Sequence, residues 1–203
     1  MTWEMARRWR TYPAGRIFPA SAGYQLPAAE LDAKQGLNLQ ASRLGIARQS
    51  SCAEAAGPAA GRVLVKYGCS AMLRASYVDA SGSMIATIGV AVLPSVNAAF
   101  RVVSALTKAK GLAERSVRPF PVRGTAAAGF TAPKVQLIEA TDRGTYVVMS
   151  VVGFADGRPR LADASDGFVD AQLKALARGL ADAVAGIVGT NPAVPRCPGA
   201  PGC

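Results

Sequence analysis

The feature that most constrains the fold of this chain is an order of β-prone and helical segments that occurs twice. Residues 71–78 alternate between apolar and more polar side chains, which is the period of a half-buried strand. A turn-rich stretch, 79–83, leads into 84–93, which is apolar on both faces and ends at a proline. Ser95 or Asn97 can cap the helix that follows. Its apolar stripe contains Val96, Ala99, Phe100, Val103 and Leu106.

The same order returns in the second half of the chain. Strands are expected over 135–141 and 145–154, with a polar turn between them, and a long helix is expected after Asp166. Two such hairpins can pair into one sheet, whose apolar surface needs helices to cover it. We therefore expect an α+β fold, in which two strand–turn–strand–helix pseudo-repeats form one antiparallel sheet with both helices packed on one face.

Composition divides the chain into three parts. Residues 10–30 are rich in Pro, Gly and Ala, and residues 1–20 carry four arginines, so 1–30 are expected to be an extended basic lead-in that could lie beside a membrane. Residues 31–190 are expected to form the single α+β domain, with a short helix within 31–46 and a helix over 52–67 that is interrupted at Gly57-Pro58. Residues 191–203 form a Pro/Gly-rich tail.

The four cysteines of the chain bear on whether it folds in an oxidising or a reducing compartment. Cys52 and Cys69 bracket one segment, and Cys197 and Cys203 bracket CPGAPGC at the end of the chain. The sequential pairing is favoured, because prolines and glycines shape the terminal loop, and the two rings would contribute roughly 2 and 3 kcal/mol. Neither spacing matches the C-x₂₋₄-C knuckles of zinc sites, although free thiols remain an alternative. Disulfides would indicate an oxidising compartment and a disulfide-stapled fold.

The stretch DASGSM has two interpretations. Asp79, Ser81 and Ser83 match the D-x-S-x-S pattern with which von Willebrand factor type A domains hold Mg²⁺. In those domains the motif leads from a parallel strand into a helix, whereas here the residues that follow, IATIGVAVLP, are typical of a strand. An Asx turn at Asp79 and a positive φ at Gly82 explain the same residues. We therefore favour a hairpin turn over a metal site and expect no cofactor.

Charge and the absence of histidine narrow the function classes. The formal net charge is +10, and residues 101–134 hold seven basic residues against Glu114. This segment is the expected anionic contact, through Arg101, Lys108, Lys110, Arg115, Arg118 and Arg123. Aromatic residues are not interleaved with these basic ones, so a nucleic-acid groove is disfavoured. With no histidine, Ser-His-Asp and Cys-His catalysis are impossible within the chain, and no catalytic residues are expected.

The first residues carry no secretory signal, and no apolar run reaches the roughly 18 residues of a membrane span. Because disulfides need an oxidising compartment, we expect a signal or membrane anchor upstream of Met1. The alternative is a cytosolic protein with free thiols.

Four features follow one another along the chain: CAEAA…YGCSAMLRASYVDASGSMIATIGVAVLP, an amphipathic helix, GTAAAGF and GTYVVMSVVGFADGRP. Together they resemble a family of actinobacterial membrane-anchored extracytoplasmic proteins. The chain is more distantly similar to the sensor domains of mycobacterial receptor kinases and to small mycobacterial lipoproteins. The resemblance implies disulfides at the four cysteines but no activity. Our first hypothesis is a non-enzymatic, sensor-like extracytoplasmic domain, anchored in or near the membrane, that binds a protein, lipid or envelope ligand. The alternatives are a Mg²⁺-dependent adhesion domain and a cytosolic nucleic-acid binder.

Overall fold

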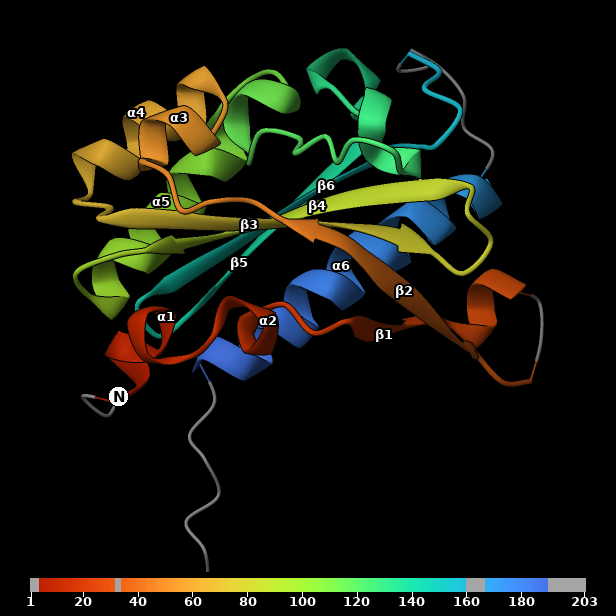
Figure 1. Ribbon diagram of the computed structural model, residues 1–203, viewed down its shortest axis with the longest axis horizontal. Helices are drawn as coiled ribbons and strands as arrows, with labels where there is room; N and C mark the ends of the chain where they lie inside the picture. Colours follow the sequence, from red (N-terminus) through yellow and green to blue (C-terminus); the bar gives the residue numbers. More distant parts are fainter. Residues whose placement is uncertain (1–3, 32–33, 160–166, 190–203) are drawn as a thin grey trace, which may run out of the picture.

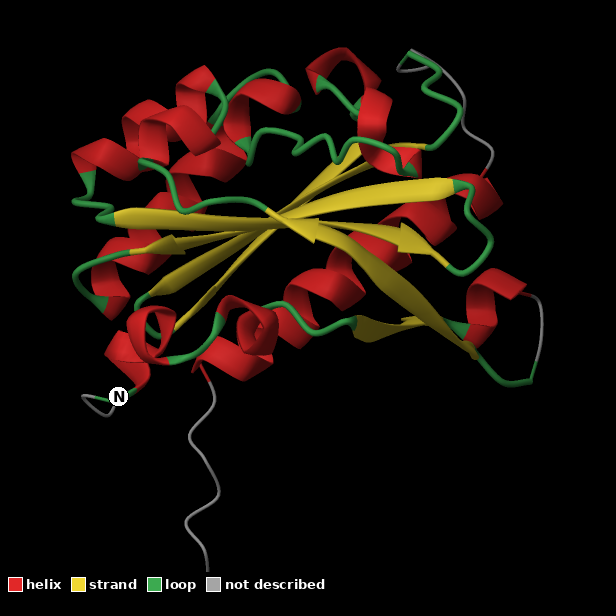
Figure 2. Cartoon of the chain, in the orientation of Figure 1, coloured by secondary structure: helices red, strands yellow, loops and turns green. Residues whose placement is uncertain are grey.

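The centre of the molecule is a curled antiparallel sheet with the strand order β1-β2-β3-β4-β6-β5 (Figure 1, Figure 2). In this computed structural model the chain is described over residues 4–31, 34–159 and 167–189. The strands are β1 (Ser21–Leu26), β2 (Leu37–Ile46), β3 (Ala71–Asp79), β4 (Met84–Val92), β5 (Leu137–Arg143) and β6 (Tyr146–Phe154). The helices are α1 (Arg8–Thr11), α2 (Ala14–Ile17), α3 (Cys52–Ala55), α4 (Pro58–Lys66), α5 (Val96–Lys108) and α6 (Gly167–Gly189). Short 3₁₀ turns are η1 (Met5–Arg7), η2 (Ala28–Leu31), η3 (Ala113–Arg115), η4 (Ala126–Gly129) and η5 (Ala132–Lys134). The α+β prediction is confirmed.

The two predicted hairpins form the middle and one edge of the sheet. β3 pairs with β4, β5 pairs with β6, and the hairpins join where β4 pairs with β6. Each hairpin leads into its predicted helix, and Ser95 caps α5 by accepting a 3.1 Å hydrogen bond from the backbone N–H of Ala98. The helix interrupted at Gly57-Pro58 is also present, as α3 and α4.

The prediction that both helices pack on one face of the sheet is wrong, because α5 and α6 cover opposite faces (Figure 1). Side chains of β4 alternate between the two layers. Ile88 belongs to the core under α6, whereas Ile85 belongs to the core under α5. Every residue of β4 is buried, and all of β6 except Phe154. A sheet that is apolar on both faces needs a layer of helices on each.

The first 46 residues also differ from expectation. Instead of an extended lead-in, residues 4–30 contain α1, α2 and β1, and instead of a short helix, residues 31–46 contain β2. β2 pairs with the outer edge of β3, and β1 pairs with β2. The free edge of the predicted hairpin therefore recruits two more strands, a tertiary effect that local propensity does not contain.

The residues between α5 and β5 belong to the basic segment 101–134, and part of them is packed on the sheet. Residues 116–122, here called the crossing segment, lie over β3 and β4 on the α5 face. Phe120 donates its backbone N–H to the Thr87 hydroxyl at 3.0 Å, and its carbonyl accepts from the Ser76 hydroxyl at 2.6 Å. A Cβ at Gly89 would lie 2.7 Å from Val117 Cγ2, so the missing side chain lets the segment approach the sheet.

One predicted disulfide is confirmed on this face. Cys52 at the start of α3 is bonded to Cys69, which follows α4, with the two Cα atoms 6.3 Å apart. The predicted Cys197–Cys203 bond lies outside the described residues.

The N-terminal helices dock against the end of α6. Arg8 is 2% exposed, and its Nη1 donates to the carbonyls of Ile187 and Val188 at 3.0 and 3.3 Å. The Tyr146 hydroxyl donates to the carbonyl of Met5 at 2.6 Å. Because the last carbonyls of a helix have no partner within it, a guanidinium there satisfies them and interacts favourably with the helix dipole.

Candidate functional site

A groove runs along α6 where this helix passes strands β1 and β2. It consists of two adjoining open hollows of ≈ 310 and ≈ 570 Å³, which share Gln25, Gly179 and Asp182. We call it the α6–β1 groove. Its other lining residues are Gly23, Tyr24, Pro27, Asn38, Leu39, Gln40, Ala171, Lys174, Ala175, Arg178 and Ala183.

The groove exists because the side of α6 that lines it carries small residues. Ala171, Ala175, Gly179 and Ala183 recur every four residues and so lie along one side of the helix. A Cβ at Gly179 would overlap Cβ of Tyr24, so glycine is what lets the helix and strand approach closely. Small side chains beside this close contact leave the space unfilled. The small-residue spacing is visible in the sequence but formed no part of the prediction of this helix.

The lining offers many hydrogen-bonding groups. Exposed amides come from β1 and β2 through Gln25, Asn38 and Gln40, and exposed charges come from α6. Ser21 donates to Gln40 Oε1 at 2.8 Å and so holds this amide across the strand pair. The charged residues of the lining are Lys174, Arg178 and Asp182. This mixture suits a polar ligand and carries little net charge.

Tyr24 is the buried aromatic residue of the groove. Burial raises the pKa of its phenol to about 12, and the nearby charge of Asp79 adds to the shift. The hydroxyl therefore keeps its proton at ordinary pH, and Tyr24 contributes a neutral apolar wall with 5% of its surface exposed.

The DASGSM stretch forms the turn between β3 and β4. Asp79 Oδ1 accepts from the backbone N–H of Met84 at 2.7 Å, while Oδ2 accepts from both the N–H (3.1 Å) and the hydroxyl of Ser81. Ser81 and Ser83 share a 2.6 Å hydrogen bond, and Gly82 has a φ of +74°. These contacts are those of the predicted Asx turn. The antiparallel hairpin is not the parallel strand-to-helix connection in which type A domains carry the motif.

The six residues of the expected anionic contact have different roles. Arg115 donates to the carbonyls of Thr107 and Ala109 at the end of α5, at 3.2 and 3.3 Å. Arg118 Nε donates to the carbonyl of Ala56 at 2.6 Å. These two guanidinium groups therefore hold backbone together. The remaining four are exposed, as Arg118 also is, with three of them on or just after α5 and one beyond the crossing segment: Arg101, Lys108, Lys110 and Arg123.

Comparison with known proteins adds no relative. No protein-family model matches the chain, and searches of curated proteins and of solved structures found no match. The resemblance stated above stays a prediction. Among the described residues, no helix combines the length and the apolar character that crossing a membrane requires.

Proposed function

We propose that the chain is a non-enzymatic extracytoplasmic domain that binds a polar envelope ligand in the α6–β1 groove. The observation that carries the proposal is the groove itself, which the small residues of α6 leave unfilled and which exposed amides and charges line. Ligand sites combine such a hollow with a few convergent polar groups. The ligand that fits this lining is rich in hydroxyl and amide groups.

The Cys52–Cys69 disulfide supports the extracytoplasmic part of the proposal. Disulfides persist in oxidising compartments and are rare where cellular thiols keep cysteines reduced. This bond joins two parts of one folded face, so it has a structural role.

The chemistry of the groove supports a binding role over a catalytic one. Its lining contains no serine, threonine or cysteine, and Tyr24 is held in its protonated form. The chain has no histidine to act as a general base. Lys174 and Asp182 lie eight residues apart on α6, about 12 Å along its axis, which is too far for a direct proton transfer.

The test compares two charge-reversal variants of the intact protein isolated from native cell envelopes. Lys174→Glu with Arg178→Glu alters the groove, and Arg101→Glu with Lys108→Glu makes the same charge change on α5. Native mass spectrometry measures any bound envelope component. We expect wild type and the α5 variant to retain a ligand mass that the groove variant loses. A wild type without a bound component, or equal retention in both variants, would contradict the proposal.

A further inference from the structure

Exposed arginines on the N-terminal helices are stacked on aromatic rings. Cζ of Arg10 lies 4.4 Å from the ring centroid of Trp9, and Cζ of Arg16 lies 3.8 Å from that of Tyr12. Both rings are partly buried against the core under α6, while both guanidinium groups are exposed. The cations therefore cover the outward faces of rings that are themselves fixed to the domain.

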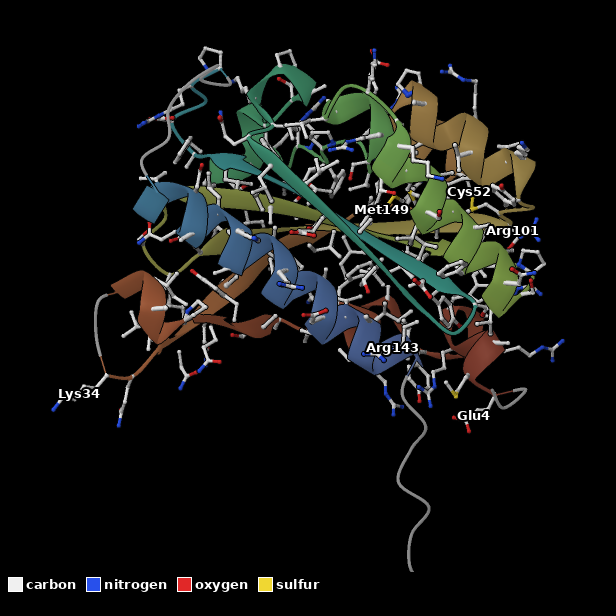
Figure 3. The ribbon with its side chains drawn as sticks, turned by 180° about the vertical axis from the view of Figure 1, so that it is seen from behind. Glu4, Lys34, Cys52, Arg101, Arg143 and Met149 are labelled. Atoms are coloured by element: carbon white, nitrogen blue, oxygen red, sulfur yellow. A yellow bond between two sulfur atoms is a disulfide. The ribbon has the colours of Figure 1, made fainter. Side chains whose placement is uncertain are left out.

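A further arginine lies at the same end of the molecule. Arg143 is exposed at the end of β5, and a Cβ at Gly189 would overlap its side chain, so it lies directly beside the end of α6. The carbonyls of Ile187 and Val188 at this end of α6 also bind Arg8, which places α1 there. Figure 3 shows the Arg143 label near the end of α6, with Glu4 at the same end of the molecule.

This end of the molecule is positively charged. Glu4 is the single acidic residue within residues 4–20. Its Oε1 lies 3.9 Å from Nη2 of the buried Arg8, whose positive charge offsets the charge of the carboxylate. The next acidic side chain along β5, that of Asp142, points to the other side of the strand from Arg143. We call this surface the arginine–aromatic end; it is formed by Trp9, Arg10, Tyr12, Arg16 and Arg143.

We propose that the arginine–aromatic end docks on the surface of an anionic lipid bilayer. Arginine attracts anionic headgroups, and Trp and Tyr are the residues favoured at the membrane–water interface. Nucleic acid fits less well, because base stacking needs the ring faces that Arg10 and Arg16 already cover. This surface is separate from the α6–β1 groove, and the proposal does not depend on a groove ligand.

The expected effect follows from the number of arginines. Each basic side chain near an anionic membrane raises the affinity about fivefold. Removing the charges of Arg10, Arg16 and Arg143 is therefore expected to weaken binding about 100-fold. Because exposed charges are screened by salt, the affinity of the wild type is also expected to fall as ionic strength rises.

The experiment measures sedimentation of the full chain, with its disulfide intact, with vesicles of phosphatidylglycerol and phosphatidylcholine. The end variant carries Arg10→Gln, Arg16→Gln and Arg143→Gln. The control variant, Arg101→Gln with Lys108→Gln and Lys110→Gln, removes the same charge from α5 and the residues just after it. Thermal unfolding confirms that each variant is folded.

We expect the affinities of wild type and the control variant for the anionic vesicles to differ by less than about fivefold. The end variant is expected to bind these vesicles about 100-fold more weakly than wild type. Vesicles of phosphatidylcholine alone are expected to bind none of the three. The proposal is overturned if wild type does not bind anionic vesicles or if both variants weaken equally. Tighter binding to DNA than to vesicles at the same low salt would also overturn it.

Discussion

The two faces of the sheet are covered in different ways. On one face the long helix α6 packs through a regular stripe of apolar residues, and Ile17 and Phe18 at the end of α2 add to the same core. The other face is covered by α3, α4, α5 and the crossing segment. The Cys52–Cys69 bond links α3 to the end of α4, and buried hydroxyls of β3 and β4 hold the crossing segment on the sheet. A continuous helix repeats one packing pattern, whereas short pieces need specific links because each buries little surface alone.

The two faces should therefore respond to different conditions. Three buried tyrosines, Tyr24, Tyr77 and Tyr146, belong to the core under α6, and burial raises the pKa of each. The disulfide belongs to the opposite core. The α6 face is expected to weaken at alkaline pH, and the opposite face to weaken on reduction.

The largest expected effect is loss of packing under α6. Leu180 is fully buried, so Leu180→Ala should lower the free energy of unfolding by about 2–5 kcal/mol, through lost burial and the cavity left behind. Urea unfolding followed by circular dichroism measures the change. Val96→Ala, at a position 49% exposed, is the control and should change stability by less than about 0.5 kcal/mol. Similar losses in both variants would show that the stripe does not hold this face.

Removing the disulfide should have the next largest effect, on the opposite face. The bond closes a loop with a sequence separation of 17 residues, so Cys52→Ser with Cys69→Ser should lower the free energy of unfolding by about 3 kcal/mol. Urea unfolding of the oxidised wild type and of the double variant gives the difference. Unchanged stability would mean that α3 and α4 need no covalent link.

The buried hydroxyls under the crossing segment give a smaller expected effect. Thr87 accepts from the N–H of Phe120 and lies 2.9 Å from the Ser76 hydroxyl. Thr87→Val keeps the shape but leaves the partly buried N–H of Phe120 unpaired, and should cost about 1–3 kcal/mol. The control is Thr107→Val at an exposed position on α5. If Thr87→Val is as stable as its control, the hydroxyls do not position this segment.

The smallest expected effect is the alkaline response of Tyr24. Its pKa is raised to about 12 in the folded state, against 10.0 for an unperturbed phenol. Between these values the unfolded chain releases the proton first, so stability is fully present below pH 10 and falls as pH rises towards 12. The expected loss at pH 11 is about 1 kcal/mol.

Urea unfolding at pH 8 and pH 11 measures this loss in wild type and in Tyr24→Phe. The variant should show a smaller decrease, because it lacks this titrating group. Identical decreases in the two proteins would rule out Tyr24 as a source of the alkaline response.

The periodic elements could be predicted from the sequence, and the irregular ones could not. Both central hairpins, α5 and α6 follow from alternation and helical spacing, which are local properties. The burial of both faces could also have been inferred, because residues 84–93 are apolar on both sides. That pattern predicts helices on each face, although we expected them on one.

Contacts between residues far apart in the sequence determine the positions of β1, β2 and the crossing segment. The partner of β2 is the free edge of β3, and the course of residues 116–122 depends on two hydroxyls and on Gly89. Nothing in the local pattern of either segment specifies these partners. For the α6–β1 groove, the spacing of Ala171, Ala175, Gly179 and Ala183 was a usable signal, but the strand that faces it was not predictable.

The most direct test of an extracytoplasmic, disulfide-stapled domain is a non-reducing peptide map by mass spectrometry. The protein is alkylated immediately on lysis of native cells and then digested. We expect a peptide pair linked through Cys52 and Cys69, with no alkylated form of either residue. Recovery of both as alkylated thiols would contradict the compartment. It would also leave the face that contains α3, α4 and α5 without its covalent link.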